Sequence, residues 1–149
     1  MVTIKRYESG GSKAFHRLAT ESYIEQTNES ASVTAENPAL QAYLEHIVAI
    51  QAGGKGLILV AEQDNKLVGF GCLQYEDTYA FLSDLYVTPG KRSQGVGSLL
   101  TEKLEEQARA MGADHIALRV AADNTASRGF YDRKQYQEKF VVMAKSLGD

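Results

Sequence analysis

The apolar residues of this 149-residue chain recur with two different periods, and the changes of period mark its segments. An apolar residue at every third or fourth position is typical of a helix with one buried face. This spacing predicts four helices: one that is capped by Ser12 and contains Phe15, Leu18, Ala19 and Tyr23, one between Asn37 and Gly53, one over Ser98–Met111, and one from Asn124 to about Arg133.

Short runs of continuous or alternating apolar residues predict strands between these helices. The predicted strands are Val2–Tyr7, Leu57–Glu62, Leu67–Tyr75, Tyr79–Val87, His115–Ala121 and Gln137–Lys145. The polar stretch Glu25–Glu36 follows neither period and is predicted to be a loop. Strands and helices that alternate in this way are typical of an α/β fold. We therefore expect a single domain over residues 1–149, with a mixed central sheet of about six strands flanked by about four helices.

Local signals fix several boundaries of these segments. Asn37 precedes Pro38, which is the usual order of an N-cap and the first helical residue. Asp64 and Asn65 separate two predicted strands and predict a hairpin turn. Gly69 and Gly71 lie inside the second of these strands, where they indicate either a close backbone approach or a bulge.

Composition narrows the classes of function. A formal net charge of −3 disfavours a nucleic-acid surface, which is usually basic. Met1–Tyr7 lacks the apolar core of a signal peptide, and no run approaches the ~20 apolar residues of a membrane span. We therefore expect a cytoplasmic protein with neither a membrane nor a nucleic-acid partner. The lone Cys72 is interpreted as a buried apolar side chain. His16, His46 and His115 show no ligand spacing, so no metal is expected.

A glycine-rich loop between a strand and a helix is the most informative segment. This glycine loop, residues 91–98, reads Lys-Arg-Ser-Gln-Gly-Val-Gly-Ser. A helix N-terminus has unpaired N–H groups and a positive dipole end, so it suits a pyrophosphate. On the loop alone, a tight turn without a ligand is an equally good interpretation. No Gly-Lys-Ser/Thr follows, and no third glycine completes a dinucleotide fingerprint, so these two phosphate motifs fit poorly.

Two spaced motifs give the chain a resemblance to the GNAT superfamily of acyl-CoA-dependent N-acetyltransferases. The family's phosphate loop, Gln/Arg-x-x-Gly-x-Gly/Ala, is matched by Arg92, Gly95 and Gly97. A second motif places a small residue three positions, and a tyrosine seven positions, after an asparagine. Asn124, Ser127 and Tyr131 follow it. The chain departs from the family at Gln135-Tyr136, where a Gly-Phe pair is usual.

The resemblance implies how acetyl-coenzyme A would be bound as co-substrate. In this family the fourth and fifth strands splay apart after a bulge in the fourth, and pantetheine pairs with strand backbone in the opening. This implies main-chain contacts from Leu85, Tyr86 and Val87. Backbone N–H groups of the glycine loop are implied to hold the pyrophosphate; the residues are Arg92, Ser93, Gln94, Gly95, Val96, Gly97 and Ser98. Asn124 and Ser127 are implied to border the pantetheine arm, although Asn124 also suits a helix N-cap.

Tyr131 and Asp84 are the candidate catalytic residues. Attack of an amine on a thioester expels a thiolate, and a phenol with a pKa near 10 can donate a proton to it. Tyr131 is therefore the candidate general acid, against the alternative of an aromatic packed beside Phe130. Asp84, just before the presumed bulge, is the candidate base, and burial would raise its pKa. Alternatively, Asp84 only orients the acceptor or caps a backbone group.

The resulting hypothesis is direct transfer of an acetyl group from acetyl-CoA to an amine of a small molecule or peptide. The acceptor pocket is expected between the first two helices and the Glu25–Glu36 loop. A non-catalytic acyl-CoA-binding regulatory module remains the alternative, and a phosphate-binding protein of unrelated fold is the third. A homodimer is compatible with the sequence.

Overall fold

The structure is a computed structural model that describes residues 1–8, 13–27 and 37–148. The chain divides into two compact units, Met1–Leu118 and Arg119–Asp149. Each unit is described by itself.

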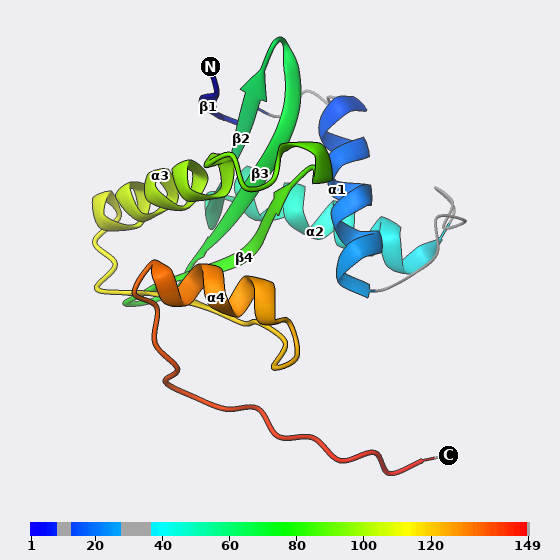
Figure 1. The fold of residues 1–149 in the computed structure, drawn as a ribbon, viewed down its shortest axis with the longest axis vertical. Coiled ribbons are helices and arrows are strands. Elements are labelled where there is room, and N and C mark those ends of the chain that lie inside the picture. The colour runs from blue at the N-terminus through cyan, green and yellow to red at the C-terminus, as the bar shows by residue number, and fades with distance from the viewer. Residues whose placement is uncertain (9–12, 28–36, 149) are drawn as a thin grey trace. The chain divides into compact units, whose positions relative to one another are not determined.

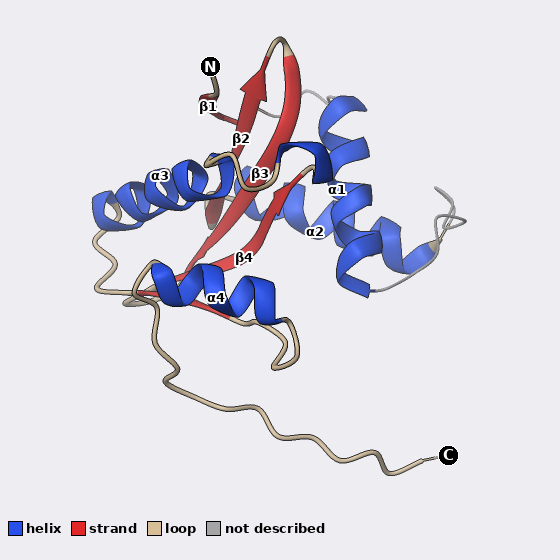
Figure 2. Ribbon diagram, viewed as in Figure 1, coloured by secondary structure: helices blue, strands red, loops and turns tan. Residues whose placement is uncertain are grey.

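The first unit is a five-stranded sheet with helices packed on it (Figures 1 and 2). Its elements in chain order are β1 (Thr3–Arg6), α1 (Lys13–Thr27), α2 (Pro38–Ala52), β2 (Gly56–Gln63), β3 (Lys66–Tyr75), β4 (Ala80–Val87), a 3₁₀ turn (Pro89–Lys91), α3 (Val96–Ala110) and β5 (Ile116–Leu118). The strands lie in sequence order, antiparallel except for the parallel pair β4–β5. The expected α/β fold with a mixed sheet is confirmed.

Local signals placed most boundaries correctly. The Asn37 side chain accepts a hydrogen bond from the Leu40 N–H at 3.1 Å and caps α2. Asp64 and Asn65 both have positive φ, 53° and 62°, which is the conformation of a tight hairpin turn. The predicted loop Glu25–Glu36 is wrong at its start, because α1 continues to Thr27. Residues 28–36 and the predicted cap Ser12 lie outside the described residues.

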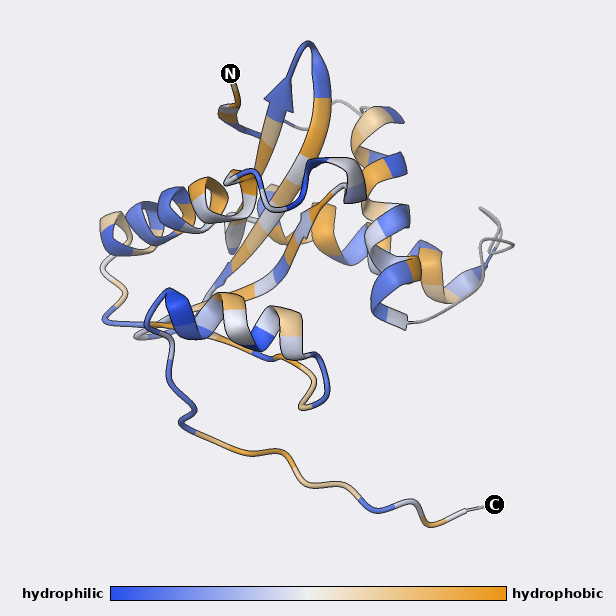
Figure 3. Cartoon of the chain, viewed as in Figure 1, coloured by the Kyte–Doolittle hydropathy of each residue, from blue (hydrophilic) through white to orange (hydrophobic). Residues whose placement is uncertain are grey.

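The two faces of the sheet bury different helices. A core cluster on one face joins the sheet to α1 and α2; its buried residues are Tyr7, Phe15, Leu18, Ala19, Ile47, Ile58, Val60, Phe70, Cys72 and Tyr86. The apolar bands of the central strands are visible in Figure 3. On the other face, a Cβ at Gly71 would lie 2.5 Å from a methyl carbon of Leu104 on α3. The close approach predicted at these two glycines is confirmed: the Leu104 side chain of α3 approaches Gly71, whereas at Gly69 the nearest atom is the Tyr86 carbonyl oxygen of β4, 2.8 Å from the Cβ position.

A bulge in β4 changes which face its side chains point to. Asp84 pairs with Cys72 and Leu82 with Leu73, so Ser83 is an extra residue. Cys72 and Leu73 are neighbours on β3 and point to opposite faces. Leu82 therefore faces α3, whereas Asp84 faces α1 and α2. Asp84 follows the bulge and does not precede it as expected, because the extra residue is Ser83.

The second unit contains α4 (Thr125–Arg133) and an extended C-terminal segment. The predicted strand Gln137–Lys145 is wrong, since residues 137–148 join no ladder, and the sheet has five described strands instead of about six. The apolar side chains that suggested this strand are exposed; they are Phe140, Val141, Val142 and Met143. The predicted strand His115–Ala121 is likewise shortened to β5. Alternation predicts a strand, but a strand also requires a partner for its backbone groups.

Gln135 occupies the turn that ends α4 with a left-handed backbone. Its φ is 70°. The N–H groups of Gln135 and Tyr136 donate to the carbonyls of Asp132 and Tyr131, both at 3.0 Å, which is the hydrogen-bond pattern of a Schellman motif. This motif favours glycine at the left-handed position. The departure from the usual Gly-Phe pair therefore leaves the turn intact and adds backbone strain.

We expect Gln135→Gly to raise the free energy of unfolding by about 1 kcal/mol, because glycine relieves the left-handed strain. Urea unfolding of the two proteins measures the difference. Lys134→Gly is the matched control, since Lys134 has φ −89°. That variant should be destabilised, and a destabilised Gln135→Gly would contradict the assignment of strain.

Candidate functional site

The glycine loop leads directly into the first turn of α3. Ser93 and Gly95 have positive φ, 62° and 87°. Gly95 is the N-cap of α3, and as a glycine it offers no side chain to cap the first turn of this helix. The helix begins at Val96, two residues before the predicted start, so Val96, Gly97 and Ser98 form its first turn. Their N–H groups and the positive dipole end of α3 make an anion site chemically reasonable.

The Arg92 side chain turns back from this loop toward α1. Its Nε donates to the Val87 carbonyl at 2.8 Å, and its Nη2 pairs with Glu25 Oε2 at 2.5 Å. Its guanidinium also lies over the Tyr86 ring, 5.5 Å from the ring centroid. The Arg92 side chain thus links the loop to β4 and α1. Arg92 would therefore contribute to an anion site through its backbone N–H.

The edge of β4 loses its partner strand midway. Leu82 pairs with Leu118, and the ladder between β4 and β5 ends there, although β4 continues to Val87. β5 ends at Leu118, so the rest of β4 has no strand partner on this side, and the splaying that the resemblance implies stays a prediction. Leu85 and Tyr86 lie on this open edge, whereas the Val87 carbonyl already accepts the bond from Arg92. The three residues predicted to bind the cofactor through their backbone, Leu85, Tyr86 and Val87, therefore form the end of β4, shortly before the glycine loop.

The Tyr86 side chain belongs to the α1 face. Its hydroxyl lies 3.4 Å from Glu21 Oε1. Burial, together with the Glu21 and Glu25 carboxylates, raises the pKa of Tyr86 to about 12. The hydroxyl therefore keeps its proton at neutral pH and serves as a donor toward α1.

The Asp84 carboxylate is buried, with 7% of the residue exposed. Its Oδ1 accepts hydrogen bonds from the Tyr43 hydroxyl at 2.8 Å and from Gln26 Nε2 at 3.2 Å. Its Oδ2 accepts one from Ser83 Oγ at 3.0 Å. We call these four residues the Asp84 cluster. Burial raises the pKa of Asp84 above its ordinary value, although the hydrogen bonds of the cluster and the charge of His46 act in the opposite direction.

Sequence reasoning missed Gln26 and Tyr43. Gln26 fell in the predicted loop, and Tyr43 was one residue of the apolar stripe of α2. The available signal was that Tyr43 carries a hydroxyl on the buried face of a helix, where such a group requires a partner.

The second unit holds the other predicted residues on α4. Asn124 caps the helix, and its Oδ1 accepts a hydrogen bond from the Ser127 N–H at 3.1 Å. The structural interpretation of Asn124 is confirmed, and its contact with a cofactor stays a prediction. Tyr131 packs edge-to-face against Phe130 and Tyr136, with ring centroids 5.1 and 5.5 Å apart. Burial raises the pKa of Tyr131 to about 12, which favours the protonated phenol.

Cys72 lies opposite Asp84 on β3 and is buried, as predicted. Burial and the Asp84 carboxylate both raise the pKa of the Cys72 thiol well above its usual value. The thiol therefore stays protonated at neutral pH and is a poor nucleophile.

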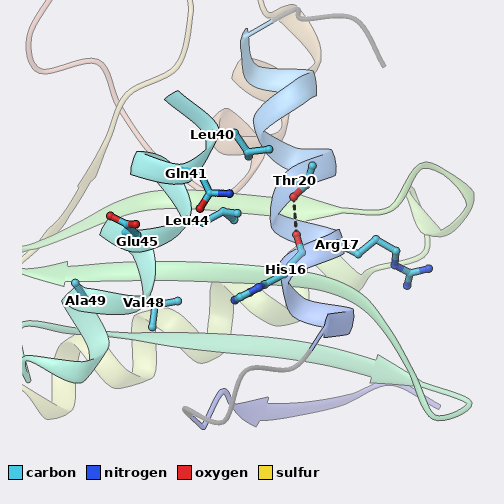
Figure 4. A pocket seen from close by; sticks show the side chains of 9 residues that line it. All are labelled: His16, Arg17, Thr20, Leu40, Gln41, Leu44, Glu45, Val48 and Ala49. Atoms are coloured by element: carbon cyan, nitrogen blue, oxygen red, sulfur yellow. Dashed lines mark hydrogen bonds between the residues drawn. The ribbon is translucent and has the colours of Figure 1, made fainter. Parts of the chain in front are cut away.

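A cavity of about 600 Å³ lies between α1 and α2 (Figure 4). Its lining residues are His16, Arg17, Thr20, Leu40, Gln41, Leu44, Glu45, Val48 and Ala49. The cavity lies between the two helices from which the acceptor pocket was predicted to be built. None of its lining residues belongs to the Asp84 cluster or to the candidate catalytic and cofactor-binding residues, and its role as the acceptor pocket stays a prediction.

Among the described residues, no group of three or more His, Cys, Asp or Glu side chains is arranged to hold a metal ion. The helices in the described ranges are also too short or too polar to cross a membrane.

Known proteins share this sequence pattern and fold. A model of the acetyltransferase (GNAT) family matches residues 13–135. The chain is 26% identical over 124 residues to an uncharacterized N-acetyltransferase, YhfO, of Bacillus subtilis strain 168, which covers 78% of this chain and 77% of the relative.

Two solved structures show the same fold. A putative acetyl transferase from Pyrococcus furiosus has a TM-score of 0.76 at 23% identity, over 99% of this chain and 100% of that one. AAC(6')-Iy, in complex with the bisubstrate analogue CoA-S-monomethyl-acetylneamine, has a TM-score of 0.77 at 17% identity, over 98% of both chains.

The raised pKa of Asp84 predicts a specific pH dependence of stability. A carboxyl whose pKa is higher in the folded state contributes stability below its unfolded pKa, and this contribution is lost as the pH rises through the folded pKa. We expect Asp84→Asn to stabilise the protein more at about pH 8 than at about pH 4, because the variant buries no charge at either pH. Urea unfolding at both pH values measures this difference. Asp77→Asn, at an exposed position, is the control and should show no such difference; an equal effect of Asp84→Asn at both pH values would contradict the raised pKa.

Proposed function

The chain belongs to the GNAT acetyltransferase family, and we propose that it transfers the acetyl group of acetyl-CoA directly to an amine of a small molecule or peptide. One observation carries this proposal. On β4, a buried carboxylate with a raised pKa stands where the strand loses its partner, and the open edge leads into the glycine loop. The bisubstrate analogue bound to AAC(6')-Iy joins CoA to an acetylated amine, which supports this combination of substrates.

The residues of the first unit fit the donor substrate. The first turn of α3 has no side-chain cap, so its N–H groups can donate to the pyrophosphate. A Cβ on Gly95 would meet no atom of the described residues within 4 Å, which suits the approach of a bulky anion to the loop. Backbone groups of Leu85 and Tyr86 on the open edge of β4 pair with the pantetheine arm. In the second unit, contacts of Asn124 and Ser127 with this arm are implied by the family resemblance alone.

Asp84 removes the proton that an amine carries at neutral pH. An ammonium cannot attack a carbonyl carbon, so this proton must leave before the carbon–nitrogen bond forms. A raised pKa makes the carboxylate a stronger base than an exposed aspartate. The proton passes to Asp84, directly or through a water molecule.

Tyr131 supplies the proton at the end of the reaction. Breakdown of the tetrahedral intermediate breaks the carbon–sulfur bond, and the thiolate of CoA leaves. The pKa of Tyr131, about 12, keeps the phenol protonated until that moment. The products are the amide, the CoA thiol and one proton released to solvent. Of the two protons that the ammonium loses, one restores the Tyr131 phenol through solvent and the other is the proton released, so Asp84 ends as the carboxylate.

Transfer is direct because the chain's cysteine does not provide a nucleophile. Cys72 is buried, and its raised pKa keeps the thiol protonated. Amine and acetyl-CoA are therefore bound at the same time, and no acetylated enzyme forms.

Calorimetric titration with acetyl-CoA tests the donor site. We expect binding that ATP does not reproduce, and a loss of roughly tenfold or more in affinity for Gly95→Val, because a branched side chain obstructs the approach of the pyrophosphate. Gly112→Val is the matched control, since Gly112 also has φ 87° and an open Cβ position, at the other end of α3. The two variants share the backbone strain, so only an effect on the donor site separates them. Absence of binding by the wild-type protein, or equal losses in the two variants, would overturn the proposal.

Tyr131→Phe should lower kcat by roughly 10²-fold while leaving acetyl-CoA affinity nearly unchanged, because only the proton donor is removed. Release of the CoA thiol with an accepted amine measures kcat, and calorimetry measures affinity. Tyr136→Phe changes the aromatic neighbour of Tyr131 and is the control. Undiminished turnover of Tyr131→Phe would remove this residue from the acid role.

A further inference from the structure

The Asp84 carboxylate receives its hydrogen bonds from three different elements. Tyr43 comes from α2, Gln26 from α1, and Ser83 from β4 itself. Gln26 is held in turn, because its Nε2 also donates to Ser22 Oγ at 2.8 Å. The bulge at Ser83 directs Asp84 to the face where both helices lie. The carboxylate is thus the point at which both helices are joined to the open part of β4.

The two oxygens of the Asp84 carboxylate accept different numbers of hydrogen bonds from the described residues. Each oxygen of a carboxylate can accept about two hydrogen bonds. Oδ1 receives both Tyr43 and Gln26, so its capacity is filled. Oδ2 receives only Ser83 from within the described residues, so one of its acceptor positions is left. A proton taken from an amine or from a water molecule is therefore directed to Oδ2.

We propose that Tyr43 is the positioning residue for proton transfer: its hydroxyl holds Asp84 Oδ1 and thereby presents Oδ2 to the incoming amine. This inference rests on the proposed function, in which Asp84 takes the amine proton. It assigns Tyr43 no contact with the reacting atoms.

Tyr43 is better suited to this role than Gln26. Its hydrogen bond is shorter, 2.8 Å against 3.2 Å. Its ring packs against the core cluster and lies 5.4 Å from the Tyr23 ring, so the hydroxyl is held in place. Burial and the Asp84 carboxylate raise the pKa of Tyr43 well above its usual value, so the phenol remains a donor throughout the working pH range. Gln26 shares its Nε2 donor between Ser22 Oγ and Asp84 Oδ1, and the bond to Ser22 is the shorter of the two, 2.8 Å against 3.2 Å.

The groups that face Asp84 determine in which direction its pKa changes when the Tyr43 hydroxyl is lost. Tyr43 and His46 from α2 lower the pKa of Asp84, as do the hydrogen bonds from Gln26 and Ser83, while burial raises it. Cys72 faces it from β3 as a protonated thiol. Loss of the Tyr43 hydroxyl removes one interaction that favours the carboxylate, so the pKa of Asp84 rises further.

The first experiment is a ¹³C NMR titration of the aspartate side-chain carboxyl groups in full-length protein, with Asp84 assigned by the signal that Asp84→Asn removes. We expect Tyr43→Phe to move the Asp84 titration to higher pH. Tyr23→Phe is the matched control, because it removes a hydroxyl from the adjacent ring and leaves the three donors of Asp84 in place. An Asp84 titration that does not move in Tyr43→Phe overturns the proposal.

The second experiment follows kcat/KM against pH, with whichever amine from a panel of aliphatic monoamines and diamines the wild-type protein acetylates fastest. The acid limb of this profile reports the base of the free enzyme. In Tyr43→Phe the limb should move to higher pH, with a loss of about tenfold on its acid side, the equivalent of one hydrogen bond to a charged group. Tyr23→Phe should leave the limb in place.

Together, the two experiments distinguish a failure of the role given to Tyr43 from a failure of the proposed function. An acid limb that stays in place while the NMR titration moves shows that Asp84 is not the base, and it overturns the role given to Tyr43. Wild-type protein that binds no acetyl-CoA refutes the proposed function itself, and the NMR titration still decides whether Tyr43 controls the carboxyl. Unchanged KM for acetyl-CoA in Tyr43→Phe supports a local effect over a general loss of structure.

Discussion

The one-residue bulge at Ser83 is the constraint on which the site depends. Because side chains alternate along a strand, one extra residue reverses the faces of everything that follows. Leu82 faces α3, whereas Asp84 and Tyr86 face α1 and α2. The ladder with β5 ends at Leu82, immediately before the bulge. The same irregularity therefore accompanies the opening of the β4 edge and turns a carboxylate into a buried, hydrogen-bonded environment.

Features set by short-range chemistry could be predicted from the sequence. The cap at Asn37, the turn at Asp64 and Asn65, and the glycine loop before α3 each depend on residues within one or two turns of each other. Their physical causes, a short polar side chain or a left-handed backbone, are properties of single residues. The order of helices and strands could be predicted from the spacing of apolar residues, because this spacing reflects the burial of one face of each element. That order was sufficient to predict the fold class.

Features set by partners far along the chain could not be predicted in this way. Tyr43 and Gln26 reach Asp84 across 41 and 58 residues. Neither has a local pattern that distinguishes it from a core aromatic or a surface amide. The position of the bulge is a property of the β3–β4 register, in which Cys72 pairs with Asp84, and this register is not encoded in a local pattern of either strand. The segment Gln137–Lys145 illustrates the reverse case, in which a strand-like pattern has no ladder in the structure.

The last turn of α1 connects the two halves of the proposed chemistry in the first unit. Glu25 pairs with Arg92 of the glycine loop, and its neighbour Gln26 donates to Asp84. The Arg92–Glu25 pair is exposed, so by itself it contributes little to stability. Its significance is geometric, because two adjacent residues of α1 reach the glycine loop and the Asp84 carboxylate. The Asp84 cluster must meet a second requirement. Burial without donors would leave the carboxyl protonated, and full exposure would leave it a weak base. The donors from α1, α2 and β4 hold it between these limits.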